Sequence, residues 1–250
     1  MNDSTSTISP AWPTRWPKDS FKSVAAWLLA AFMAALFLAV FVAGIRSSAL
    51  SLRSITPTLI DLSIAVQLVL EGGLVAGLLA ALPGLSKFGL RELGFSRPGA
   101  ATVWTAVAGA VAMAIVANGS ASLIDYFGHA KHQQDTVAIF KGLHDPATIA
   151  AFAIFAIAFA PIAEETIFRV FFFNFGLRFG GFWGGTLSSA ALFGLAHGDL
   201  YAALPLALGG VVLAFVYYRT RNAFAPMISH ALFNALSIVA LLTVPNLASG

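Results

Sequence analysis

Residues 160–169 read Ala-Pro-Ile-Ala-Glu-Glu-Thr-Ile-Phe-Arg, and they place two acids and a base inside an apolar stretch that runs from about residue 148 to 175. A charged side chain at the centre of a bilayer costs about 2.5–3.5 kcal/mol on insertion scales. We therefore expect Glu164, Glu165 and Arg169 to face a protein interior, where ionisable residues of membrane helices usually have a function. The stretch predicts a membrane-spanning fold with a functional site inside it.

The composition of the whole chain agrees with that interpretation. Of its 250 residues, 58% are hydrophobic and only 10% are charged, against about 25% charged residues in soluble domains. The chain has no cysteine, which excludes disulfides, thiol nucleophiles and cysteine-based zinc sites. Its formal net charge of +3 comes from basic residues scattered at the ends of apolar runs, so it does not indicate nucleic-acid binding.

Seven apolar runs, separated by charges or by Gly and Pro, predict an all-α polytopic membrane helix bundle with seven to eight transmembrane helices. The candidate spans are residues 22–45, 57–82, 100–118, 148–175, 184–198, 201–218 and 223–244. Segment 119–147 is too charged to face lipid, and an amphipathic or interfacial helix within it would be the eighth. Residues 1–21 are expected to form a polar cytoplasmic tail, and residues 22–245 a single membrane domain with its functional core at 148–240.

The basic residues of the connecting segments are unevenly divided between the two sides of the predicted bundle. Nine would lie on the side of the N-terminus and four on the other: Arg15, Lys18, Lys22, Lys87, Arg91, Arg97, Arg178, Arg219 and Arg221 against Arg46, Arg53, Lys131 and Lys141. Because cytoplasmic loops carry the excess of Lys and Arg, we expect the N-terminus to be cytoplasmic, in the cytoplasmic (inner) membrane.

Further polar residues lie inside two of the later spans. His197 lies in the fifth span, four residues after Phe193, and the last span carries His230 and Asn234, which are four apart and so share a helix face. Counted at 1.5 Å per residue, these polar groups and Glu164 lie about 14–21 Å from the cytoplasmic ends of their helices. Three separate helices are thus predicted to bring polar groups to one level of the membrane.

The two adjacent glutamates are expected to have different roles, because neighbouring helical residues point about 100° apart. Arg169 follows Glu165 at the i,i+4 spacing of a helical ion pair, which leaves Glu164 as the candidate general base. Each polar residue taken singly also fits a structural role, since His and Asn in membrane helices often form hydrogen bonds between helices.

Two other groups of polar residues have weaker interpretations. Gln67 and Glu71, four apart in the second span, are expected to be buried and to have a structural or rim role. His129, His132 and His144 are interpreted as solvated residues of the outer segment, with a second metal site as the alternative.

The order of these motifs resembles the CAAX protease and bacteriocin-processing (CPBP or Abi) family of intramembrane endopeptidases, which is related to the Ras-converting CAAX endopeptidase. The motifs are Glu164-Glu165-x-x-x-Arg169, Phe193-x-x-x-His197 and His230-x-x-x-Asn234, with a similar family turn at residues 91–95. Members often have Gly after the motif arginine, where this chain has Val170. The resemblance implies that Glu164 is the catalytic glutamate and that His197 helps to activate water. It also implies that His230 and Asn234 hold a metal or stabilise an oxyanion.

Two hydrolytic mechanisms fit these residues. Glu164, His197 and His230 could hold a divalent metal such as zinc, with an open position for water. Alternatively, Glu164 deprotonates the water while His230 and Asn234 donate to the oxyanion. The metal-free version is slightly favoured, because two His and an Asn are a poor set of zinc ligands without Glu164.

These observations predict a hydrolase, a protease that cleaves a membrane-associated peptide or protein within the lipid bilayer. No Ser or Cys nucleophile accompanies the cluster, so activated water is the expected nucleophile. The alternative is a proton-coupled transporter, in which buried Glu and His form a proton relay. The chain shows no internal repeat of the kind that most such transporters have.

Overall fold

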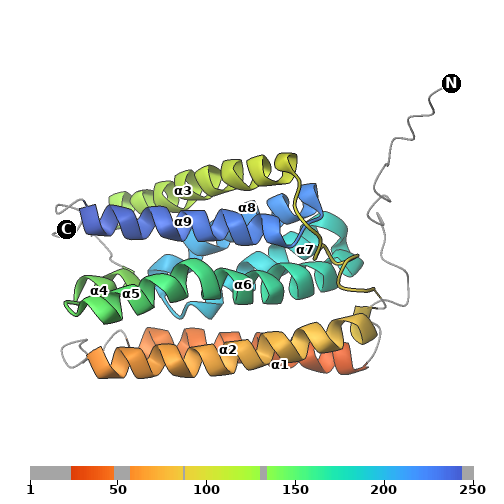
Figure 1. Cartoon of the computed structure of the whole chain (residues 1–250), viewed down its shortest axis with the longest axis horizontal. Helices are drawn as coiled ribbons and strands as arrows, with labels where there is room; N and C mark the ends of the chain where they lie inside the picture. Colours follow the sequence, from red (N-terminus) through yellow and green to blue (C-terminus); the bar gives the residue numbers. More distant parts are fainter. Residues whose placement is uncertain (1–23, 48–56, 87, 130–133, 244–250) are drawn as a thin grey trace.

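The computed structural model describes residues 24–47, 57–86, 88–129 and 134–243, and every regular element within these ranges is a helix (Figure 1). The predicted tail at residues 1–21 lies outside the described residues. In chain order the elements are α1 (Val24–Ser47), α2 (Pro57–Ser86), α3 (Ala100–Gly128), α4 (Asp135–Lys141), α5 (Pro146–Ile154), η1 (Phe155–Phe159), α6 (Ala160–Glu165), η2 (Thr166–Phe173), α7 (Asn174–Ala196), α8 (Leu200–Thr220) and α9 (Phe224–Thr243).

The long helices lie side by side along one axis, with α1 and α2 on one side, the chain from α5 to α6 in the middle, and α3, α8 and α9 beyond it (Figure 1). Five helices in the described ranges are long and apolar enough to cross a membrane, and a shorter apolar segment lies in α1. The protein is therefore an integral membrane protein with an all-helical, polytopic bundle, as the sequence predicts. Fully buried aromatic side chains of η2 and α7, among them Phe168, Phe171, Phe173 and Phe193, form its core.

The central part of the chain is a series of consecutive helical segments from Pro146 to Ala196, and it is not one straight α-helix. Two π-helical segments, η1 and η2, flank the six residues of α6. Gly180 and Gly181 then leave the helical conformation, Gly181 with a φ of 58°, and the chain turns back on itself inside α7. The two arms approach closely, because a Cβ on Gly185 would lie 2.6 Å from the carbonyl oxygen of Phe173. Glycine at this crossing lets the backbones meet.

The predicted end of the third span is wrong, because α3 continues to Gly128 instead of ending at residue 118. Leu123, Tyr126 and Phe127 lie exposed on the added turns, which keep an apolar surface around Asp125. The helix ends where His129 takes the left-handed conformation, with a φ of 51°. The separate helix expected within segment 119–147 is the seven-residue α4.

The connection between α2 and α3 packs against the short link between α8 and α9. Gly94 has a φ of 99°, and its carbonyl oxygen accepts a hydrogen bond from the Ala223 backbone at 2.9 Å. The Tyr217 hydroxyl of α8 donates to the carbonyl oxygen of Leu93 at 2.8 Å. The Asn222 amide donates to the carbonyl oxygen of Ser96 at 2.7 Å. The family-like turn at residues 91–95 therefore fixes one end of α8 and α9.

At the opposite end, Asp145 caps α5 and ties it to α2. Its carboxylate accepts from the backbone N–H of Thr148 at 2.8 Å, and this hydrogen bond lowers the pKa of the Asp145 carboxyl below its usual value. The Thr148 hydroxyl also lies 3.3 Å from a carboxylate oxygen of Asp61 on α2. These contacts set the position at which the central helix begins.

Candidate active site

Glu165 and Arg169 form a fully buried ion pair, as their spacing predicts. Arg169 Nη1 donates to Glu165 Oε1 at 2.8 Å, and both side chains are 0% exposed. Arg169 Nη2 donates to the carbonyl oxygen of Gly210 on α8 at 3.0 Å. A Cβ on Gly210 would lie 3.1 Å from the Cα of Ala190, so glycine allows α8 to approach α7 closely enough for this contact. The pair therefore anchors η2 to α8.

His230 of α9 reaches both glutamates of α6. Its Nδ1 lies 3.0 Å from Glu165 Oε1, the oxygen that also accepts from Arg169. A carboxylate paired with an arginine only accepts, so Nδ1 carries a proton and donates it to Glu165, and Nε2 is the nitrogen that faces Glu164. Nε2 lies 3.9 Å from Glu164 Oε2, too far for a direct hydrogen bond. Glu165 thus orients His230 toward Glu164.

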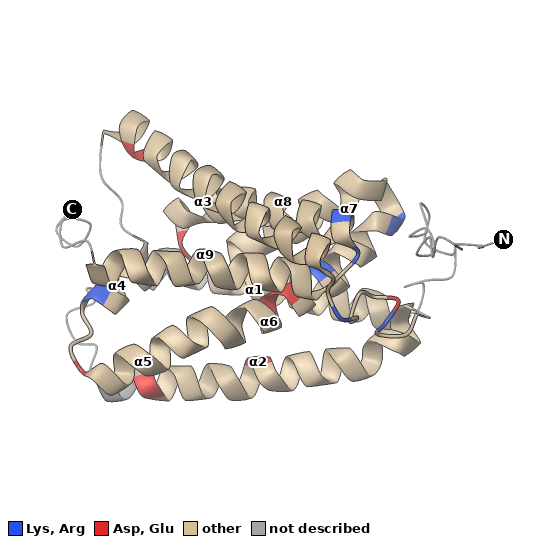
Figure 2. Ribbon diagram, turned by 45° about the horizontal axis from the view of Figure 1, so that its top comes forward, with Lys and Arg blue, Asp and Glu red and all other residues tan. Residues whose placement is uncertain are grey.

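Glu164 is the more accessible of the two acids. Its side chain is 23% exposed, against 0% for Glu165. Its Oε2 atom is buried and has no hydrogen-bond partner among the described residues. Figure 2 shows the acidic positions of α6 midway along the bundle, whereas most of the basic positions lie toward one end. The two acids therefore differ in their surroundings: Glu165 is held in a buried ion pair, and Glu164 is partly accessible.

Three of the polar side chains of the site lie around the ring of Phe193. The Arg169 guanidinium lies 4.5 Å from its centroid, the ring of His197 lies 4.9 Å away, and that of His230 lies 5.6 Å away. His197 Nδ1 lies 2.8 Å from the carbonyl oxygen of Phe193, which only accepts, so Nδ1 is the donor in this contact and Nε2 takes no part in it. Polar groups of η2, α7 and α9 therefore meet around one aromatic side chain.

Asn234 makes a different contact. It lies one turn beyond His230 on α9, and its Nδ2 donates to the carbonyl oxygen of Ala156 in η1 at 2.7 Å. The amide therefore joins α9 to a π-helical turn, and in this conformation its donor group is occupied by the backbone.

Of Gln67 and Glu71 on α2, Glu71 lies close enough to Glu164 for the charges of their carboxyl groups to interact. Its Oε2 atom is buried without a hydrogen-bond partner among the described residues. Gln67, which we expected to be buried, is exposed, because it lies on the side of α2 turned away from the bundle. Spacing within α2 could not show which of the two side chains faces the other helices.

Glu164, His197 and His230 are side chains of the types that bind zinc, since histidine nitrogens and a carboxylate are common zinc ligands. The arrangement of these side chains does not fit a zinc site, because among the described residues no three His, Asp or Glu side chains come together as a metal site requires. The same finding covers His129 and His144 near the two ends of the α3–α5 connection, which are both exposed, whereas His132 lies outside the described residues.

Comparison with known proteins points to the same segment of the chain. The sequence model of the Rce1-like type II CAAX prenyl endopeptidases matches residues 146–236, from the first residue of α5 into α9. This segment is similar to the Rce1-like family. The match contains every polar group described at the site except Glu71, so the Rce1-like region and the buried cluster coincide.

A curated relative, "Putative membrane peptidase YdiL" of Bacillus subtilis (strain 168), is 30% identical over 129 residues. The alignment covers 51% of this chain and 52% of the relative, so the chain spans about half the length of the curated relative that it matches. No solved structure matches the chain.

Proposed function

We propose that the protein is an intramembrane endopeptidase that hydrolyses a peptide bond of a membrane-associated peptide or protein. The observation that carries the proposal is the pairing of an accessible Glu164 with a His230 that Glu165 and Arg169 orient. This pair lies inside the segment that is similar to the Rce1-like family.

In the proposed reaction Glu164 takes a proton from a water molecule, and the water oxygen attacks the carbonyl carbon of the peptide bond. The proton then passes from Glu164 to the leaving nitrogen as the carbon–nitrogen bond breaks. His230 serves as a donor to the oxyanion when its Nε2 is protonated, while its Nδ1 continues to donate to Glu165. His197 supports the activation of water, and Asn234 becomes an oxyanion donor if it releases the Ala156 carbonyl.

The proposal also covers the course of the chain through the membrane. With the turn at Gly180 and Gly181, residues 146–196 cross twice, and together with α1, α2, α3, α8 and α9 they make seven passes. The gathering of basic residues at one end of the bundle supports a cytoplasmic N-terminus and a site that is reached from the cytoplasm (Figure 2).

The test is cleavage of membrane peptides by the purified protein in lipid. Glu164→Gln keeps the size of the side chain but cannot take a proton, so we expect no cleavage by a variant that folds normally. A prenylated peptide compared with its unmodified counterpart would define the substrate class. Proton-coupled transport into sealed vesicles without cleavage of either peptide would refute the proposal in favour of a transporter.

A further inference from the structure

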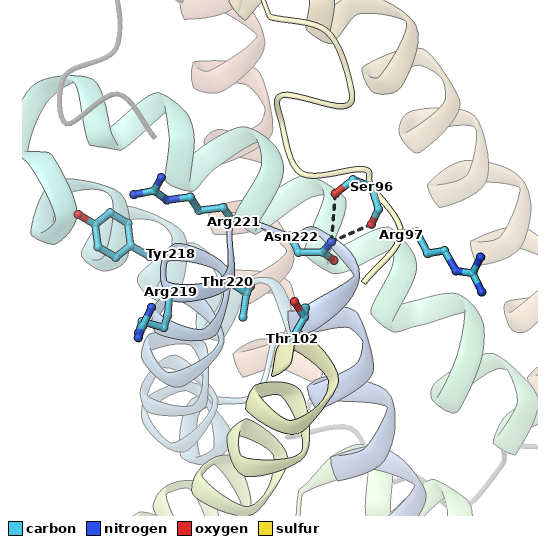
Figure 3. A pocket seen from close by; sticks show the side chains of 8 residues that line it. All are labelled: Ser96, Arg97, Thr102, Tyr218, Arg219, Thr220, Arg221 and Asn222. Carbon is cyan, nitrogen blue, oxygen red and sulfur yellow. Dashed lines mark hydrogen bonds between the residues drawn. The ribbon is translucent and has the colours of Figure 1, made fainter. Parts of the chain in front are cut away.

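A basic cavity opens at the end of the bundle where α8 is joined to α9. It has a volume of about 510 Å³ and is lined by Ser96, Arg97, Thr102, Tyr218, Arg219, Thr220, Arg221 and Asn222 (Figure 3). Three of these residues are arginines and none is acidic. Figure 3 shows Arg97 on one side and Arg219 and Arg221 on the other, with Ser96, Asn222 and Thr102 between them.

The polar floor of the cavity is held by buried hydrogen bonds. Asn222 is 4% exposed, and its Nδ2 donates to the carbonyl oxygen of Ser96 at 2.7 Å and to Ser96 Oγ at 3.3 Å. Its Oδ1 accepts from the backbone N–H of Phe224 at 3.0 Å, which caps α9. Asn222 therefore connects the start of α9 to the segment before α3.

Hydrogen-bond donors in this cavity remain available for a ligand. Ser96 Oγ accepts from Asn222, so its hydroxyl hydrogen can be donated elsewhere. Thr102 lies in the first turn of α3, and no described residue accepts from its hydroxyl. The N-cap of α3, Gly99, offers no side-chain hydrogen bond to the first-turn N–H groups. Donors and arginines without a lining acid form a site for an anion.

Aromatic residues place this end of the bundle at the membrane surface. Trp104 is 71% exposed one turn into α3, and Phe224 at the start of α9 and Tyr218 at the end of α8 are 38% and 37% exposed. Trp and Tyr are enriched at the level of the lipid headgroups. The nearest abundant anions at that level are lipid phosphates, and basic pockets between membrane helices bind lipid headgroups.

We propose that this cavity binds one phosphate-bearing headgroup of an anionic lipid. The side chains of Arg97 and Arg219 are exposed and point away from each other in the structure (Figure 3), and in the proposed complex they turn inward to hold the phosphate oxygens from two sides. The Ser96 and Thr102 hydroxyls donate to the same oxygens. The proposal is independent of the peptidase activity, because none of these residues belongs to the site around Glu164.

The test is the retention of lipid by the full-length protein in lipid discs of phosphatidylcholine with one-fifth phosphatidylglycerol, measured by native mass spectrometry. We expect one tightly held phosphatidylglycerol, and about tenfold weaker retention in Arg97→Gln and in Arg219→Gln, since hydrogen bonds to charged groups are worth roughly this factor. Arg178→Gln removes the same charge outside the cavity and should retain the lipid. Thr102→Val should weaken retention, whereas Thr105→Val, outside the cavity, should not.

If Arg178→Gln and Arg219→Gln weaken lipid retention equally, at unchanged melting temperatures, the retention comes from general surface charge and the proposal is overturned. Release of the lipid by millimolar inorganic phosphate would assign the cavity to a soluble phosphate compound and overturn the lipid assignment. If Arg219→Gln does not fold, Thr102→Val tests the same site with a change that leaves every charge in place.

Discussion

Replacing Glu165 by Gln removes the carboxylate charge that is hydrogen-bonded to Arg169 while keeping an oxygen that can accept from His230. Arg169 is 0% exposed, and its other described hydrogen bond goes to a neutral carbonyl. Removing one partner of a buried ion pair typically costs about 3–5 kcal/mol, because the remaining charge has lost its compensation. At about 2–4 °C per kcal/mol for a chain of this size, the melting temperature should fall by roughly 6–20 °C.

Glu164→Gln is the matched control, since it is the same chemical change at the neighbouring position. Its carboxylate is 23% exposed and lies 3.9 Å from His230, so its replacement should cost about 1 kcal/mol or less. The double variant Glu165→Gln with Arg169→Met removes both buried charges and should recover most of the lost stability. Thermal unfolding in one detergent compares all three variants with the parent chain.

The reasoning about the two acids would be refuted by equal melting temperatures for Glu165→Gln and Glu164→Gln. It would be reversed if Glu165→Gln folded normally and abolished cleavage while Glu164→Gln remained active. In that case Glu165 would be the base, and its contact with Arg169 would serve catalysis instead of stability.

Three further predictions concern metal, backbone and topology. We expect purified protein to keep cleaving after chelation and dialysis; about one equivalent of zinc on active protein, lost together with activity, would contradict this. Gly94→Ala should destabilise the protein by about 1–3 kcal/mol in thermal unfolding, because Gly94 has a φ of 99° and a Cβ would lie 2.8 Å from the backbone nitrogen of Ala223; an unchanged melting temperature would show that the turn can shift. Single cysteines replacing Arg178 or Arg221 in this cysteine-free chain should react with impermeant thiol reagents only when the cytoplasmic face is open, and labelling from outside intact cells would reverse the proposed orientation.

Much of the site could be predicted from the sequence because its key contact is local. The pair of Glu165 and Arg169 follows from i,i+4 spacing, and the common level at which His197 and His230 contact the ring of Phe193 follows from counting residues to the helix ends. These two predictions depend only on helical geometry and on the high cost of charge in lipid. The all-helical fold class also follows from the membrane environment, since a chain this apolar must satisfy its backbone hydrogen bonds internally.

The remaining features depend on contacts between distant segments. The approach of Glu71 to Glu164 and the exposure of Gln67 depend on how α2 is rotated against α6, which spacing within α2 does not specify. The hydrogen bond of Asn234 to the Ala156 carbonyl depends on a π-helical turn in another part of the chain. The predicted end of α3 is wrong because the charge of segment 119–147 does not mark where the helix stops: one acid near a helix end, here Asp125, can reach the aqueous surface.

The π-helical segments on both sides of α6 affect how this chain can be compared with its relatives. A π-helical turn holds one residue more than the α-helical turn that it replaces, and such turns often lie at functional sites. A relative that lacks one residue between positions 170 and 173 could close η2 into an ordinary helix and still keep Glu164, Glu165 and Arg169 in register. Alignments of related sequences should therefore allow a one-residue gap after Arg169, and the side chains beyond it would then face a different neighbour in each subgroup.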